Sequence, residues 1–495
     1  MDERALVVGI DLSTQSCTVE ARRAADMSVV ARARTPLPPT SPPVSEHDAR
    51  VWWAALEESF RILGEGVELA SIAAMSVSGQ CHGLVALDEA GEPVRPVKLW
   101  NDTSTAAHLE KLLGRVDARM WIERTGSRPT AAFTISKLAW FLAEEPESAA
   151  RTRTILLPHD YINYRLTGRF ATERSEASGT GYFDSEKNAY DFELLRLCFG
   201  DAMEWESLFP EVLGPNERLG EVTADAARAL GISAGIPVAV GGGDQHIAAL
   251  GLGIASGDVV FSLGTSGVVI ASSDTPVRDP NGRVDGVANA VGGWLPLVCS
   301  LNSTKVTDWF ARVLGIGVRE LDELALAAEI AAPGPAFAAY LDGERTPAYP
   351  LAAGVITGLT GETTRSALAR SVFEGVLSGL VRGMGAIEAC GVDVSSGKVI
   401  AIGGGARSAA YTTILADLLG RPVEVIGEPE ATARGACLQA LALLRGEDVA
   451  EVAVRFRLEP DRIIDPREGG RRWTEVEAEY MRACGFAAAL DRSAF

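Results

Sequence analysis

Residues 241–250 read GGGDQHIAAL and place an acid, an amide and an imidazole beside three glycines. Three kinds of chemistry are open to this segment: Asp244 and His246 could bind a metal ion, the glycines could cradle a phosphate, or Asp244 could act as a general base. The start of a helix favours an ionised carboxylate, and an N-cap would occupy the same position. A metal pair is disfavoured because helical positions two apart lie on opposite sides, so we expect His246 to be a packed or interface residue.

Three turns rich in Gly, Ser and Thr each follow an apolar strand, at residues 11–16 (DLSTQS), 263–267 (LGTSG) and 403–408 (GGGARS). One such turn is often a plain connection, but three in one α/β chain favour anion binding through backbone N–H groups. The chain has only six lysines, so an anionic substrate must be held mainly by backbone N–H groups, arginines and a metal ion. Asp11 ends the first strand beside such a turn, where it could help to hold Mg²⁺ or cap the turn.

Two polar segments have the residue types that recognise sugar hydroxyls. Residues 76–88 (SVSGQCHGLVALD) place Gln, Cys and His between two expected strands, and residues 98–103 (KLWNDT) add an amide and a carboxylate beside a tryptophan. A lone histidine is more often structural. Cys81 has no adjacent base, so packing is a simpler interpretation of this residue than nucleophilic catalysis.

Composition excludes several classes of protein. A net charge of −20 argues against a broad surface for nucleic acid or for an anionic membrane. No run approaches the ~18 apolar residues of a membrane span. The seven cysteines are scattered, with no C-x-x-C pair, which is typical of a reducing compartment, so we expect a cytoplasmic protein. The P-loop, dinucleotide-binding, zinc-protease and serine-hydrolase motifs are absent.

Strands alternate with helices along the chain, which predicts α/β domains with mixed sheets flanked by helices. A chain of 495 residues should form at least two domains. Residues 6–19 and 257–271 share a strand–turn–strand pattern, which suggests a duplicated architecture whose two turns face a shared cleft. Expected helices cover 49–63, 133–145, 365–391 and 432–445, and expected strands cover 72–79, 236–244 and 398–405. The boundary is expected after Gly243, which gives domains 1–243 and 244–495.

Taken in order, these motifs resemble the FGGY family of carbohydrate kinases over nearly the whole chain. The segments that carry the resemblance are GIDLSTQS, SGQCHG, LWND, FTISKLAW, LLPHDYINYRLTG, GGGDQ, SLGTSGV, YLDGERTP, GLTGETTRSALARSVFEG, IGGGARS and TARGACLQA. The resemblance implies two actin/hexokinase-like (ribonuclease-H-like) domains closing over an active-site cleft, the first binding the sugar and the second ATP.

By the same resemblance, Asp244 is the general base and takes the proton from a terminal hydroxyl of a ketopentose, while Asp11 helps to place Mg²⁺. The residues implied at the phosphates and along the nucleotide are Ser13, Thr14, Gly264, Thr265, Ser266, Gly404, Gly405 and Ser408. The residues implied to line the sugar pocket are Gln80, Cys81, His82, Trp100, Asn101, Asp102 and Gln245.

Within the family the resemblance is greatest to xylulokinases, which implies ATP-dependent conversion of D-xylulose to D-xylulose 5-phosphate. Ser13 stands where the first phosphate turn of the family usually has Gly. Cys81 replaces the Met common in xylulokinases, and Gln245 replaces their frequent Asn, so D-ribulose, L-ribulose, a sugar alcohol or glycerol stay open as substrates. A non-catalytic ATP-binding protein of the actin/chaperone type is the alternative from another class. The sequence does not fix the oligomeric state, and a homodimer stays open.

Overall fold

The computed structural model describes residues 4–330 and 334–490, which form two compact units. The first unit comprises the chain up to Ile254 together with Gly286–Trp294 and Glu430–Arg457, and the second comprises Ala255–Asp285, Leu295–Pro429 and the chain from Leu458 onward. This division differs from the boundary expected after Gly243, because helix α11 (Asp244–Leu252) packs against helix α16 (Ala431–Arg445) inside the first unit. Within the described ranges, no helix combines the length and apolar character needed to cross a membrane.

The first unit is built on a mixed sheet. Its strands lie in the order β13 (Arg218–Glu221), β14 (Pro237–Ala239), β5 (Ile72–Gly79), β1 (Leu6–Leu12), β2 (Ser16–Arg23) and β3 (Val29–Pro36), and β15 (Gly242–Gly243) also pairs with β5. Strands β1 and β2 form an antiparallel hairpin, while β1 and β5 are parallel, with Leu12 opposite Gly79. The ends of β1 and β5 therefore bring the 13–16 turn beside residues 80–82.

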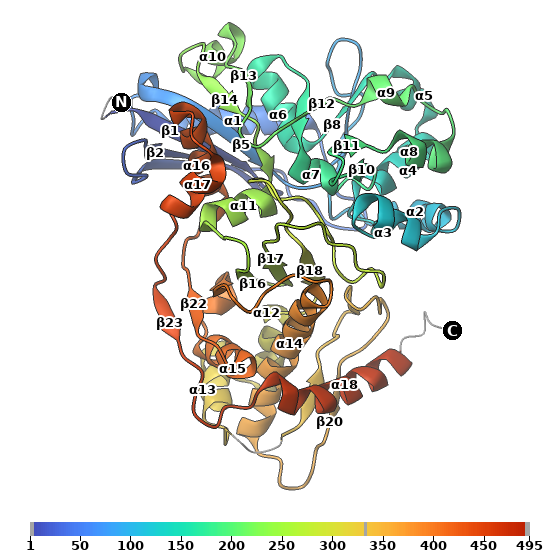
Figure 1. The fold of residues 1–495 in the computed structure, drawn as a ribbon, viewed down its shortest axis with the longest axis vertical. Helices are drawn as coiled ribbons and strands as arrows, with labels where there is room; N and C mark the ends of the chain where they lie inside the picture. The colour runs from blue at the N-terminus through green and yellow to red at the C-terminus, as the bar shows by residue number, and fades with distance from the viewer. Residues whose placement is uncertain (1–3, 331–333, 491–495) are drawn as a thin grey trace. The chain divides into compact units, whose positions relative to one another are not determined.

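Helices cover both faces of this sheet (Figure 1). Leu6, Val8 and Ile10 point to one core with α1 (Ala49–Leu63), while Val7 points to the other core with α11 and α16, as the period of a strand requires. A Cβ on Gly9 would lie 2.0 Å from the carbonyl oxygen of Ala433, so α16 rests directly on the backbone of β1. The other helices of these layers are α6 (Pro158–Thr167), α10 (Ala224–Leu230) and α17 (Val449–Arg455).

A second part of the first unit has its own apolar core around Trp121, Phe133 and Leu138. Its helices are α2 (Ala106–Leu113), α3 (Ala118–Thr125), α4 (Thr134–Glu144), α5 (Pro146–Arg151), α7 (Arg174–Ser178), α8 (Phe192–Phe199) and α9 (Trp205–Leu208). Short strand pairs complete the unit: β4 (Glu46–His47) with β7 (Val97–Lys98), β6 (Val85–Leu87) with β8 (Thr154–Leu156), β9 (Ala171–Glu173) with β12 (Glu211–Leu213), and β10 (Phe183–Asp184) with β11 (Ala189–Tyr190).

The second unit repeats the hairpin at the centre of another mixed sheet. Its strands lie in the order β18 (Leu297–Ser300), β17 (Gly267–Ala271), β16 (Val259–Leu263), β21 (Val399–Ile402), β22 (Val423–Val425) and β23 (Arg462–Ile464). Strands β16 and β17 are antiparallel, and β16 is parallel to β21. The repeated strand–turn–strand pattern therefore forms equivalent hairpins in the two sheets, as the sequence predicts.

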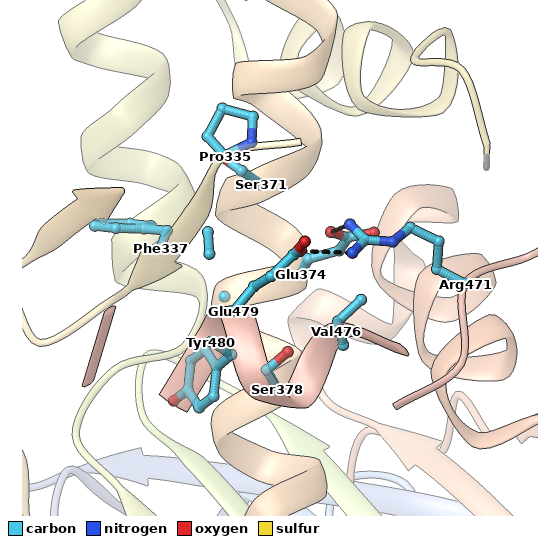
Figure 2. Close-up of a pocket in the computed structure, with 11 residues that line it drawn as sticks. Pro335, Phe337, Ser371, Glu374, Ser378, Arg471, Val476, Glu479 and Tyr480 are labelled. Carbon is cyan, nitrogen blue, oxygen red and sulfur yellow. Dashed lines mark hydrogen bonds and ion pairs between the residues drawn. The ribbon is translucent and has the colours of Figure 1, made fainter. Parts of the chain in front are cut away.

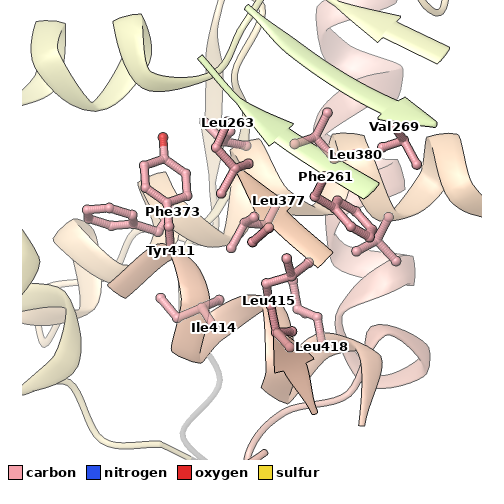
Figure 3. Close-up of a cluster of buried hydrophobic side chains, with 14 of the residues drawn as sticks. Phe261, Leu263, Val269, Phe373, Leu377, Leu380, Tyr411, Ile414, Leu415 and Leu418 are labelled. Atoms are coloured by element: carbon pink, nitrogen blue, oxygen red, sulfur yellow. The ribbon is translucent and has the colours of Figure 1, made fainter. Parts of the chain in front are cut away.

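The core of the second unit lies between this sheet and its helices. Phe261 and Leu263 of the sheet pack with Phe373 and Leu377 of the long helix α14 (Arg365–Glu388) and with Leu415 of α15 (Ala409–Leu419) (Figure 3). The remaining elements are α12 (Thr304–Leu314), α13 (Val318–Leu326), α18 (Trp473–Ala489), β19 (Ala336–Ala338), β20 (Val355–Thr357) and the short 3-10 helix η2 (Gly404–Arg407). The structure confirms the α/β class. It places a helix in each range where the sequence predicts one, 49–63, 133–145, 365–391 and 432–445.

The strand expected over 236–244 is interrupted. It forms β14 and β15, with Gly241 between them at φ +84°, a backbone conformation that disfavours other residues. A Cβ on Gly241 would lie 2.2 Å from the carbonyl oxygen of Val77. Only glycine therefore allows the backbone to pass this close to β5 before α11 begins.

Candidate active site

Asp244 is the first residue of α11, and the preceding Gly243 is the N-cap. The Asp244 side chain does not cap the helix; its Oδ1 accepts hydrogen bonds from the Gln245 N–H (2.7 Å) and the Cys81 thiol (3.3 Å). No described residue donates to Oδ2. Burial raises the pKa of Asp244 above its ordinary value of 3.8. One oxygen is thus held in place and the other is available to accept a proton.

Thr14 of the first phosphate turn contacts two residues predicted to bind the sugar, Gln80 and Trp100. Its hydroxyl donates to Gln80 Oε1 (3.1 Å) and accepts from the indole N–H of Trp100 (2.9 Å). Within the described chain, the Gln80 Nε2 and Asn101 Oδ1 atoms are buried without a partner. Because buried polar groups are normally satisfied, these atoms suit a ligand that carries hydroxyl groups.

Asp11 lies near the end of β1, close to two other carboxylates. Burial, together with the nearby carboxylates of Asp244 and Glu430, raises the pKa of Asp11 to about 8, and its buried Oδ1 has no hydrogen-bond partner among the described residues. A hard cation such as Mg²⁺ prefers oxygen ligands and would neutralise this charge, so the residues present fit a magnesium ion.

Glu176 of α7 belongs to this region although no sequence motif singles it out. Its carboxylate is fully buried and accepts a hydrogen bond from the His82 backbone N–H, and His82 Nδ1 lies 3.6 Å from Oε1. Burial raises the pKa of Glu176 to about 8. His82 has a φ of +66° and its ring stacks on Phe133 with centroids 5.3 Å apart. Such a conformation is uncommon outside glycine and occurs often at functional sites.

Cys81 is also buried, and its thiol contacts both carboxylates of this region, those of Glu176 and Asp244. Burial and these two negative charges raise the pKa of Cys81 well above its ordinary value. The residue is therefore a protonated thiol that donates a hydrogen bond, and it is unsuited to nucleophilic attack.

Asp102 and His246 are both buried within the protein. The Asp102 carboxylate is fully buried and accepts hydrogen bonds from the Ser45 N–H, Lys98 Nζ and Ser104, which favours a role in holding its loop over contact with a sugar. His246 is buried, and burial lowers its pKa to about 4, so it is a neutral packed residue as expected.

The second unit presents an exposed turn after β16. Thr265 and Ser266 are exposed, and within the described residues their backbone N–H groups have no acceptor. The Thr304 N–H and hydroxyl both donate to the Gly264 carbonyl oxygen at 3.0 Å. These two hydrogen bonds fix the position of the turn. An arrangement of free N–H groups and hydroxyls on a fixed turn can bind an anion.

The third glycine-rich turn follows β21 in the same unit. A Cβ on Gly405 would lie 2.8 Å from side-chain atoms of both Leu263 and Thr304, whereas nothing lies within 4 Å of one on Gly404. Gly405 therefore permits close packing, and Gly404 leaves its backbone open to a ligand. The Ser408 hydroxyl accepts from the Tyr411 N–H as the N-cap of α15 and donates to Asp322 Oδ1 (2.6 Å), so it serves the helix.

Two cavities differ in what they could hold. In the first unit, a cavity of about 690 Å³ is lined by Ser13, Thr14, Gln15, Arg34, Trp100 and Asn101 together with residues of the 37–40 loop. In the second unit, Figure 2 shows a cavity between α14 and α18 where Arg471 lies beside Glu374. That second cavity measures about 10 Å³, room for about one water molecule. Only the first has the size of a small-molecule site.

The chain is similar to known proteins over nearly all of its length. Residues 6–251 match the N-terminal domain of the FGGY family of carbohydrate kinases, and residues 259–444 match its C-terminal domain. A xylulose kinase of Streptomyces coelicolor is 42% identical over 94% of both chains, and one of Escherichia coli is 34% identical over 85% of this chain and 86% of the relative.

Solved structures agree with this. The crystal structure of a xylulose kinase from Bifidobacterium adolescentis superimposes with a TM-score of 0.87 at 35% identity, covering 97% of this chain and all of that one. The two mixed sheets, each with a central hairpin and flanking helices, are thus the actin/hexokinase-like halves of a sugar kinase fold. The chain belongs to the FGGY family of carbohydrate kinases, and it is a phosphotransferase that uses ATP.

Proposed function

We propose that the protein transfers the γ-phosphoryl group of ATP to a terminal hydroxyl of D-xylulose, with Asp244 as the general base. The names of the relatives support the substrate, since the proteins at 42% and 34% identity are both xylulose kinases. The observation that carries the base assignment is the geometry of Asp244, where Oδ1 is held by Cys81 and Gln245 and Oδ2 has no partner in the described chain.

The residues around Asp244 can position the sugar. Gln80, Trp100 and Thr14 form a connected set of donors and acceptors, and the unpaired Gln80 Nε2 and Asn101 Oδ1 atoms can bind sugar hydroxyls. Asp244 accepts the proton as the hydroxyl oxygen forms its bond to phosphorus and the bond from phosphorus to the ADP oxygen breaks. Phosphoryl transfer depends mainly on positioning and charge stabilisation, so a single well-placed carboxylate suffices as the base.

The exposed turn at Gly264, Thr265 and Ser266 would bind phosphate oxygens through its free N–H groups, and the open backbone at Gly404 would lie along the nucleotide. Asp11 would hold Mg²⁺, which when bound supplies positive charge to the phosphates during transfer. The alternative of a non-catalytic ATP-binding protein is excluded by membership of the kinase family.

Asp11→Asn should weaken the apparent affinity for Mg²⁺ by about 10- to 100-fold, because it removes the charge of the proposed ligand. The measurement is Mg²⁺ titration of ATP turnover, together with calorimetric titration of Mg²⁺ in the presence of a non-hydrolysable ATP analogue. Asp26→Asn, at the exposed turn after β2, serves as the control. An unchanged Mg²⁺ dependence in Asp11→Asn would remove Asp11 from the metal site.

D-xylulose should give the highest kcat/KM in a panel that also holds D-ribulose, L-ribulose, sugar alcohols and glycerol. The assay couples ADP formation to NADH oxidation at saturating Mg-ATP. A Cys81→Met variant, which restores the residue common in xylulokinases, should keep xylulose as the preferred substrate, because the thiol contacts Asp244 from within the protein. Activity on ribulose alone would overturn the xylulose assignment while leaving the kinase chemistry in place.

A further inference from the structure

The cavity of the first unit contains a cation that the proposed function does not use. Arg34, an exposed residue of β3, lines this cavity together with Ser13, Thr14, Trp100 and Asn101. The hydroxyls of a neutral sugar can be bound by uncharged donors and acceptors, whereas the positive charge of Arg34 favours an anionic ligand.

The guanidinium group of Arg34 makes one hydrogen bond within the protein, through its Nε atom. Its Nε donates to the Ser16 hydroxyl (3.0 Å), which lies 3.2 Å from the Ser13 hydroxyl in the same turn. No carboxylate among the described residues forms an ion pair with Arg34. The neighbouring cations of this sheet differ, because Arg22 and Arg32 both pair with the buried Glu20. Within the described residues, the two Nη groups of Arg34 have no partner and remain available as donors.

The surroundings of Arg34 indicate what it could bind. The adjacent 13–16 turn is the first of the three glycine-, serine- and threonine-rich turns, and within the described chain the Thr14 and Gln15 backbone N–H groups have no acceptor. A planar guanidinium beside free N–H groups matches the tetrahedral oxygens of a phosphoryl group.

We propose that Arg34 binds the phosphoryl group that is transferred, either on ATP or on the sugar phosphate product. The inference rests on the proposed kinase function and adds a side chain to its phosphate site. Arg34 stays protonated throughout: the bond from phosphorus to the ADP oxygen breaks, the bond to the sugar oxygen forms, and the sugar proton goes to Asp244. The contribution of Arg34 is two charge-assisted hydrogen bonds that strengthen as charge develops.

Arg34→Ala should lower kcat by about 100-fold, as the loss of a preorganised donor does, and should leave the KM for the sugar unchanged. Arg34→Lys should recover part of the rate, because it keeps the charge without the planar fork. Added guanidinium ion should partly restore Arg34→Ala, which a purely structural defect would not allow. Arg61→Ala, an exposed arginine of α1 paired with Glu58 and Glu65, is the matched control and should be unaffected.

Calorimetry separates the two sources of the phosphoryl group and does not require turnover. Weaker binding of D-xylulose 5-phosphate to Arg34→Ala identifies the product phosphate, and weaker binding of ATP identifies the γ-phosphate. Wild-type kcat and unchanged affinity for both ligands in Arg34→Ala would overturn the inference while leaving the kinase function intact. If the wild-type protein phosphorylates no sugar, the proposed function fails, and the affinities for the two phosphates still decide the role of Arg34.

Discussion

Asp244→Ala should reduce kcat by at least about 10³-fold while ATP still binds, because a positioned general base contributes about 10²- to 10⁴-fold. The Asp244 Oδ1 atom is fixed by the Gln245 N–H and the Cys81 thiol, so the variant loses an oriented carboxylate and not a flexible surface group. The rate is measured by coupled ADP release, and ATP binding by calorimetry.

Asp225→Ala is a matched control for this experiment. Asp225 is likewise an acid in the first turn of a helix of the first unit, α10, but it is exposed and pairs with Arg228. Its loss should leave kcat unchanged. Asp244→Ala should also fold at least as stably as the wild type, because burial already penalises the Asp244 carboxylate and raises its pKa. Sugar phosphorylation at the wild-type rate in Asp244→Ala would rule out the base assignment.

Gly435→Ala should cost about 3 kcal/mol of stability, the upper end for over-packing, and should lower kcat by about 100-fold. A Cβ on Gly435 would lie 1.9 Å from the Ile247 carbonyl oxygen, and one on Gly251 would lie 1.9 Å from the Ala431 carbonyl oxygen. Helices α11 and α16 are therefore in backbone contact (Figure 1). Since Asp244 begins α11, forcing the two helices apart displaces the base.

Gly385→Ala tests the same substitution without the clash. Gly385 lies in α14, and nothing lies within 4 Å of a Cβ built there, so alanine should stabilise the protein by up to about 1 kcal/mol through helix propensity. Urea unfolding gives the stabilities, and the coupled assay gives the rates. A Gly435→Ala protein as stable and active as Gly385→Ala would show that the contact between α11 and α16 does not position Asp244.

Local patterns predicted the elements well where the signal was periodic. The amphipathic segment at 49–63 forms α1 with these bounds, and the segment expected from 432 to 445 forms α16 one residue longer at its start. The domain boundary was predicted less well. Residues 430–457 return to the first unit because α16 buries Leu438 and Leu441 against the opposite face of β1 and β5, a long-range contact that no local pattern encodes.

In the candidate site, too, local patterns predicted some residues but not those whose role depends on long-range contacts. Asp244, Thr14 and Gln80 could be proposed from motifs because each follows a strand in a recognisable segment. Glu176 could not, because its role depends on burial beside Cys81 and His82, which are far from it in the sequence. Asp102 fits a sugar pocket by residue type, but the structure surrounds its carboxylate with Ser45, Lys98 and Ser104.

The sequence by itself determined the family, the α/β class, the paired hairpins and the identity of the acid that begins α11, because strand and helix periodicity and turn chemistry are local properties of the chain. Only the tertiary structure decided which groups are satisfied. It joined Thr14 to Gln80 and Trp100, left Asp244 Oδ2 and the Nη groups of Arg34 without partners in the described chain, and paired Arg32 with Glu20. Burial and hydrogen bonding depend on contacts between distant segments, and those contacts separate a structural polar residue from one that is free to bind a ligand.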